Sequence, residues 1–425
     1  MAALSDAQLD GLERLVASAP DAVLEALQAS GEAGGVGPAA AMAEGELRER
    51  RAAALVFAPL LPPASGQWNL PPADIRRLWR TLDRAHPAEA RRVTSAVARA
   101  ALESVGAEPL DALCLSAAAI VRREPSSFAG LAVEPARLAL ALELAPVLRR
   151  ALTRLPDWLG RNTGEGTALA RLAYRDAARG SPEAGPLFLT ILQGHLPEPW
   201  LILRVIASVM GRPTDRFVAG SELSGFGETV LADAAEAVAA VQAFAADPVG
   251  FEGEAAVHLQ RALVQLEQFE LAFDMARDGP WGERVTRLRR ALAGAVESAC
   301  ESAVAAVAKA LPLKRQPTNM KTLRGAPRLD GPPDVGALQR ASVLVAFLAA
   351  TGTALDGGYR AARARTVERL TERLAQYLDD LVERIHARDG EAETARAHLD
   401  AAAELYGLLT DRRTADASRR RAAAA

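Results

Sequence analysis

The chain has 425 residues, half of them hydrophobic but only 4% aromatic, and a formal net charge of −3. Single hydrophobic cores stop growing at about 250 to 300 residues, which excludes a protein with one ordinary domain. The small net charge excludes a global field that would draw the whole molecule onto nucleic acid or an anionic membrane, so any anion binding must be local. The apolar residues are mostly Ala, Leu and Val, and this composition predicts an all-α fold.

The first residues bear on where the protein is located. The N-terminus reads MAALSDAQLD, with two early aspartates and without the basic and apolar regions of a signal peptide, so we expect a cytoplasmic protein. The longest strongly apolar stretch without charge, 341–355, is shorter than the about 20 residues that a membrane span requires. We interpret it as a buried core helix and expect no transmembrane segment.

Prolines and glycines interrupt the first half of the chain at short intervals, for example in 61–72, at Pro156 and at Pro182. Proline fits the first turn of a helix but disrupts a helix interior. The spacing of these residues therefore predicts a first domain, 1–217, made of short helices that pack as helical hairpins.

The second half has a more regular pattern. Apolar residues recur every three or four positions over 223–245, 285–307 and 367–385, which predicts long amphipathic helices. A helix of roughly 28 residues is about 42 Å long. We therefore expect the second domain, 218–411, to be an elongated antiparallel bundle, followed by a flexible Arg/Ala tail, 412–425.

One segment of the second domain differs from the rest in charge. No acidic residue falls between Ser302 and Leu329. All three lysines of the chain lie there, and every other basic residue of the chain is arginine, a bias typical of a GC-rich bacterial genome. The basic residues of this segment are Lys309, Lys314, Arg315, Lys321, Arg324 and Arg328.

The part of this segment that follows Ala310 is predicted to be a loop. The range 311–334 is rich in proline and glycine and is too long for an ordinary connection inside a compact domain. A basic loop can bind the phosphate groups of lipid or nucleic acid, or an acidic protein surface. It can also be a solvated linker. The six basic residues are nevertheless the candidate anion-binding or partner-binding site.

The sequence contains no recognisable catalytic or metal-binding pattern. No two of the five histidines lie three or four residues apart, so an HExxH site is absent, and each histidine is expected at the surface or at a helix end. Cys114 and Cys300 form no CxxC pair and are expected to be buried, reduced thiols. We expect no catalytic residue, metal or cofactor, and no small-molecule substrate is evident.

One acidic pattern needs to be weighed separately. Asp379, Asp380 and Glu383 read DDLVE, which superficially resembles the aspartate-rich motif by which helical isoprenoid synthases hold magnesium diphosphate. The same three residues fall opposite the apolar stripe of their own predicted helix. They are therefore expected on its solvated face.

Three functional hypotheses follow. The leading one is a cytoplasmic helical adaptor or scaffold that acts through protein–protein contacts without catalysis, with a partner that the sequence does not identify. The second is a peripheral protein that binds an anionic surface, lipid headgroups or nucleic acid, through 309–328. The third is a magnesium-dependent diphosphate enzyme that depends on DDLVE alone.

Overall fold

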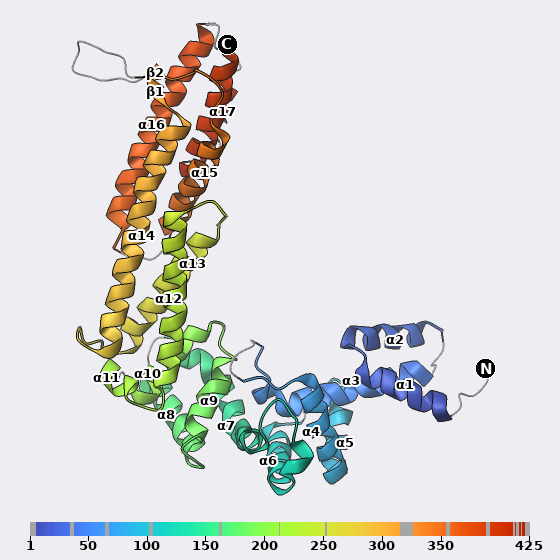
Figure 1. Cartoon of the computed structure of the whole chain (residues 1–425). Helices are drawn as coiled ribbons and strands as arrows, with labels where there is room; N and C mark the ends of the chain where they lie inside the picture. The colour runs from blue at the N-terminus through green and yellow to red at the C-terminus, as the bar shows by residue number, and fades with distance from the viewer. Residues whose placement is uncertain are drawn as a thin grey trace. The chain divides into compact units, whose positions relative to one another are not determined.

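The structure is a computed structural model of the whole chain. Within the residues that it describes, the protein is all-α, as predicted: it has 17 α-helices and one small two-stranded hairpin (Figure 1). The chain divides into two compact units, Met1–Gly211 (unit 1) and Arg212–Ala425 (unit 2). The described residues are 6–34, 38–63, 68–101, 105–160, 164–211, 213–250, 253–314, 326–353, 358–387 and 392–410, together with 413, 416, 417, 419 and 420.

Unit 1 consists of ten α-helices and short 3₁₀ turns. Several of these helices begin at a proline, which supplies no N–H where a helix has no acceptor for one. The helices are α1 (Asp6–Ser18), α2 (Asp21–Gly34), α3 (Pro38–Phe57), α4 (Pro72–Ala85), α5 (Pro87–Ala98), α6 (Ala107–Arg123), α7 (Pro135–Leu159), α8 (Gly164–Ala178), α9 (Ala184–Gln193) and α10 (Ile202–Met210), with η1 (Ala58–Leu60), η3 (Pro125–Phe128) and η4 (Pro199–Leu201).

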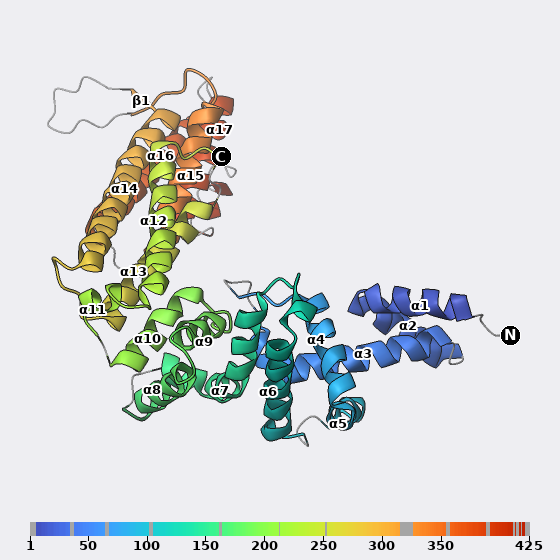
Figure 2. The same ribbon diagram turned by 60° about the horizontal axis from the view of Figure 1, so that its bottom comes forward.

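Consecutive helices of unit 1 pack against one another as hairpins, such as α2 on α3, α6 on α7 and α7 on α8 (Figure 2). Helix α3 is central to the first part of this unit, because it contacts α1, α2, α4, α5 and α6. Its buried side, which includes Leu47, Val56 and Phe57, faces these neighbours. As a result α1 and α4, which are far apart in the sequence, are held on the same helix.

Helix α7 departs from the predicted pattern of short helices. It is 25 residues long and contains two prolines in its interior, Pro146 and Pro156. The prediction that Pro156 separates two short helices is therefore wrong. A proline inside a helix removes one backbone hydrogen bond, but Leu155 and Trp158 on either side of Pro156 are buried, and this packing stabilises the last turn.

Unit 2 contains the two longest described helices, with 31 and 27 residues. The elements are α11 (Asp215–Ala219), α12 (Ser224–Ala246), α13 (Glu254–Ala272), α14 (Pro280–Ala310), β1 (Leu313–Lys314), β2 (Ala326–Pro327), α15 (Val335–Ala350), η5 (Thr351–Thr353), α16 (Arg360–His386) and α17 (Ala392–Leu409). The helices α12 to α17 lie lengthwise beside one another (Figure 1). Helix α14 has 31 residues, which corresponds to about 46 Å.

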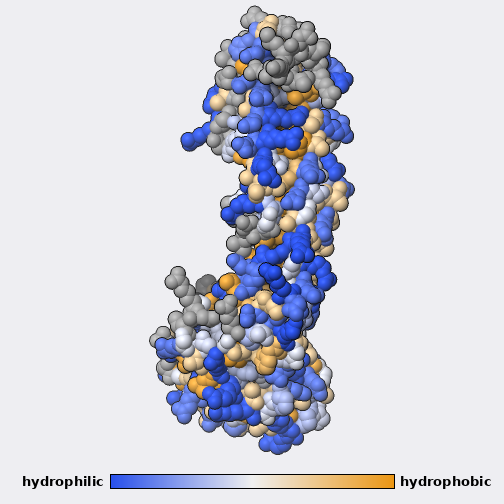
Figure 3. Space-filling view, turned by 90° about the vertical axis from the view of Figure 1, so that its left-hand side faces the viewer, coloured by the Kyte–Doolittle hydropathy of each residue, from blue (hydrophilic) through white to orange (hydrophobic). Residues whose placement is uncertain are grey.

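The apolar stripes of the sequence form the core of this bundle. The three predicted stripes lie in α12, α14 and α16, and one buried cluster contains residues from all of them, such as Val241, Val296 and Leu381. The apolar stretch 341–355 begins in α15, where Leu344 is fully buried. On the face of unit 2 that Figure 3 shows, hydrophilic residues predominate and hydrophobic residues are scattered between them.

Two helices of this bundle are long and apolar enough to cross a membrane. Among the described residues, α12 and α14 pass this test of length and composition, and 44% of the relevant window of each is buried. The finding is weak evidence for a membrane span, because the core helices of a water-soluble protein pass the same test.

The short helix α11 belongs to unit 2, so the division at Gly211 precedes the boundary at 217 expected from the sequence. Asp215 is fully buried, and its carboxylate accepts a hydrogen bond from the backbone N–H of Gly282, in the first turn of α14, at 3.3 Å. A Cβ atom at Gly279 would overlap this carboxylate, so glycine is required there. These contacts fix α11 to the start of α14.

Candidate functional site

The structure describes half of the six basic residues predicted to form a binding site. Lys309 lies in the last turn of α14, Lys314 in β1, and Arg328 directly after β2, and all three are exposed. Because β1 and β2 pair antiparallel, Lys314 and Arg328 lie near the base of one hairpin. We call β1, β2 and the three described cations the basic hairpin. The other predicted residues, Arg315, Lys321 and Arg324, lie outside the described residues.

An acidic residue just beyond the predicted segment neutralises part of this charge. The carboxylate of Asp330 lies 3.2 Å from the ammonium group of Lys314 and accepts a hydrogen bond of 2.5 Å from Nε of Arg328. The hydrogen bonds from Arg328 and Lys314 hold the pKa of Asp330 below its usual value of 3.8, so this carboxylate is ionised at neutral pH. Two of the three described cations therefore already have an anionic partner.

The chain on both sides of the basic hairpin is fixed to the bundle by hydrogen bonds. Arg373 of α16 donates to the carbonyl oxygen of Leu311 at 3.3 Å. Nε2 of His398 lies 2.9 Å from the carbonyl oxygen of Gly331, and its Nδ1 lies 3.1 Å from the hydroxyl of Tyr377. Since a carbonyl only accepts, Nε2 carries a proton, and in the neutral imidazole Nδ1 then accepts a hydrogen bond from the Tyr377 hydroxyl. Burial raises the pKa of Tyr377 far above its usual value, so the hydroxyl keeps its proton.

A second basic surface lies in unit 1, where the sequence analysis predicted none. A recess of about 700 Å³ lies between α1, α4 and η3. Five of the residues that line it are arginines and one is acidic. We call this recess the arginine groove; its charged lining residues are Arg14 of α1, Arg76, Arg77, Arg80 and Arg84 of α4, and Glu124, which precedes η3.

The amphipathic pattern of α4 explains why its arginines gather on one side. Leu78 and Leu82 are buried against the rest of unit 1. Arg76, Arg80 and Arg84 follow one another at intervals of four residues. In a helix this interval keeps side chains on one face, with a rise of about 6 Å per step. The three guanidinium groups therefore form a row along the exposed side of α4.

Two of the arginines also hold the walls of the groove in place. Arg76 donates a hydrogen bond to the carbonyl oxygen of Ala17 near the end of α1, and Arg77 donates one to the carbonyl oxygen of Ser127 in η3. Helix α4 is thereby connected to both neighbouring elements. Among the described residues, no hydrogen bond to a backbone carbonyl is found for the remaining three, Arg14, Arg80 and Arg84.

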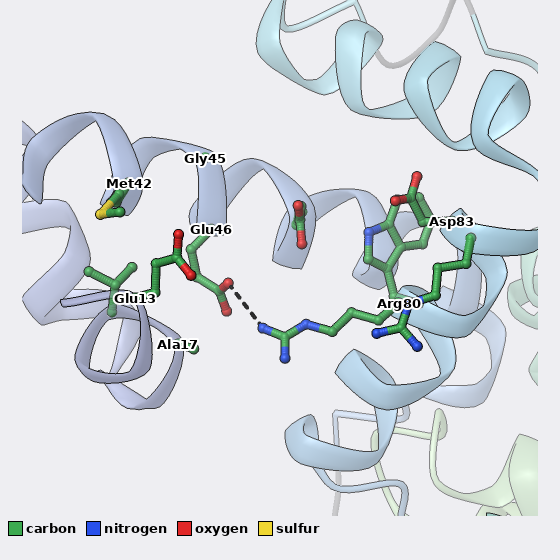
Figure 4. Close-up of a pocket in the computed structure, with 11 residues that line it drawn as sticks. Glu13, Ala17, Met42, Gly45, Glu46, Arg80 and Asp83 are labelled. Carbon is green, nitrogen blue, oxygen red and sulfur yellow. Dashed lines mark ion pairs between the residues drawn. The ribbon is translucent and has the colours of Figure 1, made fainter. Parts of the chain in front are cut away.

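A smaller pocket of about 370 Å³ adjoins the groove, and the two share Ala17, Arg80 and Arg84. Figure 4 shows Arg80 extending from α4 toward Glu46 of α3 across this pocket. Partial desolvation, followed by the nearby charge of Glu46, raises the pKa of the exposed residue Glu49 above its usual value of 4.5. The acidic residues that line the pocket are Glu13, Glu46, Glu49 and Asp83.

Glu46 only partly neutralises the arginine groove. Its carboxylate lies 3.7 Å from Arg80 and 3.8 Å from Arg76, which is at the outer limit of an ion pair. The same carboxylate accepts a hydrogen bond of 2.8 Å from Arg50, which is its closest basic neighbour. No ion pair to Arg14, Arg77 or Arg84 is found among the described residues. Within the described lining of the groove itself, arginines therefore outnumber acidic residues, while the acidic residues of the adjoining pocket lie on the side of Arg80 and Arg84.

Comparisons of the chain with protein-family models, with curated proteins and with solved structures found no match. The chemical character of the two basic surfaces therefore has to be judged from their own residues. Guanidinium groups bind carboxylate and phosphate oxygens through paired hydrogen bonds, and this is the chemistry that the arginine groove offers.

The structure places the other candidates from the sequence as follows. Asp379 and Glu383 are exposed and Asp380 is half-buried, in agreement with a solvated face of α16. Within the described part of the chain, no three His, Cys, Asp or Glu side chains are grouped so that they could hold a metal ion. Both cysteines are free and buried, and burial raises the pKa of the Cys114 thiol to about 12.

The prediction that every histidine lies at the surface or at a helix end is wrong for His398, which is 2% exposed within α17. Most of the predicted tail, 412–425, lies outside the described residues. In its described part, Arg419 forms ion pairs with Asp400 at 3.3 Å and with Asp416 at 3.1 Å.

Sequence reasoning missed the arginine groove, although a signal for it was present. The segment from Arg76 to Arg84 reads RRLWRTLDR, in which arginines recur on one face of a helix whose opposite face is apolar. A search for long runs without acidic residues passes over it, because Asp83 lies within it. The contribution of Arg14, which comes from a distant helix, required the fold.

Proposed function

We propose that this protein is a cytoplasmic helical adaptor or scaffold, and that its arginine groove receives an acidic segment of a protein partner. The observation that carries this proposal is the gathering of five guanidinium groups around one recess in which Glu124 is the one acidic residue among the described lining residues. Like charges repel one another, so a cluster of this kind favours the binding of an anion that neutralises it.

The lining of the groove favours binding over catalysis. Guanidinium groups remain protonated at neutral pH, so they can attract and orient an anion but do not transfer protons. The fixed positions of Arg76 and Arg77, which donate to the backbone of α1 and η3, support a groove that exists before its ligand arrives. The burial of apolar residues of α12 and α14 within the bundle core supports a location in the aqueous phase.

A capture experiment with two variants of the full-length protein tests this proposal. The groove variant carries Arg14→Gln, Arg80→Gln and Arg84→Gln. The control variant carries the same change at three exposed arginines elsewhere in unit 1, Arg92, Arg137 and Arg175. Both variants lose the same net charge, so they differ only in where it is lost.

Each protein is used as bait in a lysate of the source organism at moderate ionic strength. We expect a partner that the native protein and the control variant retain and that the groove variant loses. The captured protein should contain an acidic segment, and a synthetic peptide of that segment should compete for binding. The proposal fails if the groove variant and the control variant retain the same proteins in the same amounts.

The basic hairpin supports a second proposal, that the protein attaches to an anionic surface. Lys309, Lys314 and Arg328 are all exposed near one end of the bundle, which is the arrangement that such attachment requires. Sedimentation with phosphatidylserine vesicles and binding to duplex DNA, each measured over a range of salt concentrations, test it. Binding that does not change when Lys314 and Arg328 are replaced by Gln would rule out the hairpin as the attachment site.

A further inference from the structure

The arginine groove carries a further inference about its ligand, which rests on the proposed function. Among its lining residues, the positive charges come from two directions, with Arg14 on α1 and Arg80 and Arg84 on α4. These three are the arginines that the groove variant removes. They are not used to hold the backbone of the groove, and of the three only Arg80 has an ion pair among the described residues, with Glu46 at 3.7 Å.

The number of converging guanidinium groups distinguishes among anions. A carboxylate carries one negative charge, and a single arginine can neutralise it in a bidentate ion pair. A phosphate monoester carries about −1.5 to −2 charges at neutral pH and has three strong acceptor oxygens. Among the described residues that line the groove, five arginines face one acidic residue, Glu124, which is more positive charge than one further carboxylate neutralises.

The lining also bears on which phosphate compounds fit. Proteins that bind single-stranded nucleic acid without sequence preference stack its bases on aromatic side chains. The described residues that line the arginine groove are arginine, alanine, serine, threonine and glutamate, without an aromatic side chain among them. A base would therefore gain no aromatic stacking contact within this lining, whereas the guanidinium groups offer paired hydrogen bonds to a phosphoryl group.

Two of the three hydroxyl side chains in the described lining already donate hydrogen bonds within their own helices. The hydroxyl of Ser18 donates to the carbonyl oxygen of Leu15 at 3.0 Å, and the hydroxyl of Thr81 donates to that of Arg77 at 2.9 Å. Both hydroxyl protons are thus engaged within their own helices. A ligand of the groove must supply acceptor oxygens for guanidinium donors, as a phosphoryl group does.

We propose that the arginine groove binds phosphorylated side chains of the partner segment, with neighbouring phosphoryl groups placed along the row of arginines on α4. One helical step from Arg80 to Arg84 spans about 6 Å. Phosphoserines four residues apart on a helix, or two residues apart in an extended segment, have a similar spacing. A doubly phosphorylated segment therefore matches the groove better than a singly phosphorylated one.

Fluorescence anisotropy with the full-length protein tests this inference. The probe is a fluorescein-labelled Gly/Ser peptide with two phosphoserines four residues apart. Its controls are the same peptide with two glutamates and with two unmodified serines, and unlabelled tripolyphosphate serves as a competitor. We expect the doubly phosphorylated peptide to bind at least about tenfold more tightly than the glutamate peptide.

The two variants locate the site. The groove variant should weaken binding of the doubly phosphorylated peptide at least about tenfold, whereas the control variant should change it less than about twofold. A third variant with Lys at the same three groove positions retains the charge. It should bind more weakly than native protein, because the ammonium group lacks the paired geometry of guanidinium. Circular dichroism and the thermal midpoint verify that each variant is folded.

Three results would overturn the inference. Equal affinity for the phosphoserine and glutamate peptides would show that only acidity is recognised, which leaves the proposed function intact. Equal loss of binding in the groove and control variants would show that the interaction is general charge attraction. Binding of tripolyphosphate without binding of any peptide would assign the groove to a free phosphate compound in place of a protein partner.

Discussion

The arginine groove and the basic hairpin are both cationic, but they differ in how their charge is balanced. In the hairpin, Asp330 binds Lys314 and Arg328 directly. In the groove, Glu46 approaches two of the five arginines only at 3.7 and 3.8 Å. The free energy that an incoming anion gains depends on the charge that remains unpaired, and the groove has more of it.

A run of basic residues in a sequence therefore does not by itself predict a surface with net positive charge. The segment 302–329 has no acidic residue, yet Asp330, directly after it, forms ion pairs with two of its cations and offsets one of their two charges. The region of α4 contains Asp83 and looks balanced in sequence. Its arginines nevertheless line a groove with few acidic side chains.

The largest expected effect comes from reversing charge in the groove. The double change Arg80→Glu and Arg84→Glu should weaken binding of tripolyphosphate by more than about 100-fold, or roughly 3 kcal/mol. The corresponding change of Lys314 and Arg328 to Glu should weaken it less than about threefold, because Asp330 already screens these cations. Isothermal titration calorimetry at low salt measures the tripolyphosphate affinity of both variants. A larger loss of affinity in the hairpin variant than in the groove variant would contradict the prediction.

A smaller effect is expected when the support of the hairpin is weakened. Tyr377→Phe removes the donor to Nδ1 of His398 and leaves a buried acceptor unsatisfied, which should destabilise unit 2 by about 1 to 3 kcal/mol. Tyr406→Phe on α17 is a suitable control, since Tyr406 is only half-buried. Urea unfolding followed by circular dichroism measures both. An unchanged midpoint for Tyr377→Phe would show that the Tyr377–His398 contact does not support the hairpin.

The screening by Asp330 predicts a gain of binding. Asp330→Asn should strengthen attachment of the hairpin to phosphatidylserine vesicles about threefold to tenfold at neutral pH, because Lys314 and Arg328 lose their internal partner. Binding of anions at the groove should not change. Vesicle sedimentation measures the affinity of the native and the variant protein for these vesicles. An unchanged affinity would mean that the pairing with Asp330 does not weaken the attachment of the hairpin.

The pKa of Asp330 sets the pH range of this screening. A carboxylate whose pKa is lowered by folding stabilises the folded protein at any pH above its pKa in the unfolded chain. This stabilisation is lost as the pH falls through its pKa in the folded protein. The pairing with Lys314 and Arg328 therefore persists from neutral pH down to below 3.8. The hairpin should gain no affinity from mild acidification between neutral pH and that value, a result that vesicle sedimentation can verify in native protein.

The smallest effect is expected beside the groove. The pKa of Glu49 is raised in the folded protein. Its contribution to stability is therefore fully present below pH 4.5 and is lost as the pH rises through its pKa in the folded protein. Glu49→Gln should therefore stabilise the protein at neutral pH, by less than about 0.5 kcal/mol, and not at pH 4. Thermal unfolding at the two pH values measures this difference. Equal midpoints for native and variant protein at neutral pH would contradict it.

Much of the fold could be predicted from the sequence, because helices that bury one face carry a periodic signal. The apolar stripes of α12, α14 and α16 are examples. Pro156 was misjudged because tertiary packing of Leu155 and Trp158 stabilises the turn around it. The position of His398 could not be predicted either, since its partners Tyr377 and Gly331 come from other parts of the chain.

The sites were less predictable than the fold. Lys314 and Arg328 were identified from composition, but their pairing with Asp330 depends on how the hairpin closes. The arginine groove depends on the approach of α1 to α4, and no local pattern encodes that approach. The spacing of Arg76 to Arg84 could have drawn attention to α4, but only the fold adds Arg14 to the same recess.

The way in which α1 is attached has a consequence for work with shortened forms of the protein. Arg50 of α3 donates to the carbonyl oxygens of Ala17 and Ala19 at 3.0 and 2.8 Å, and to the carboxylate of Asp21 at 2.6 Å. One side chain thus holds the connection between α1 and α2 through hydrogen bonds. Deleting the first 20 residues would remove one wall of the groove together with Arg14. An N-terminally trimmed protein could therefore remain folded and lose its ligand while every arginine of α4 is intact.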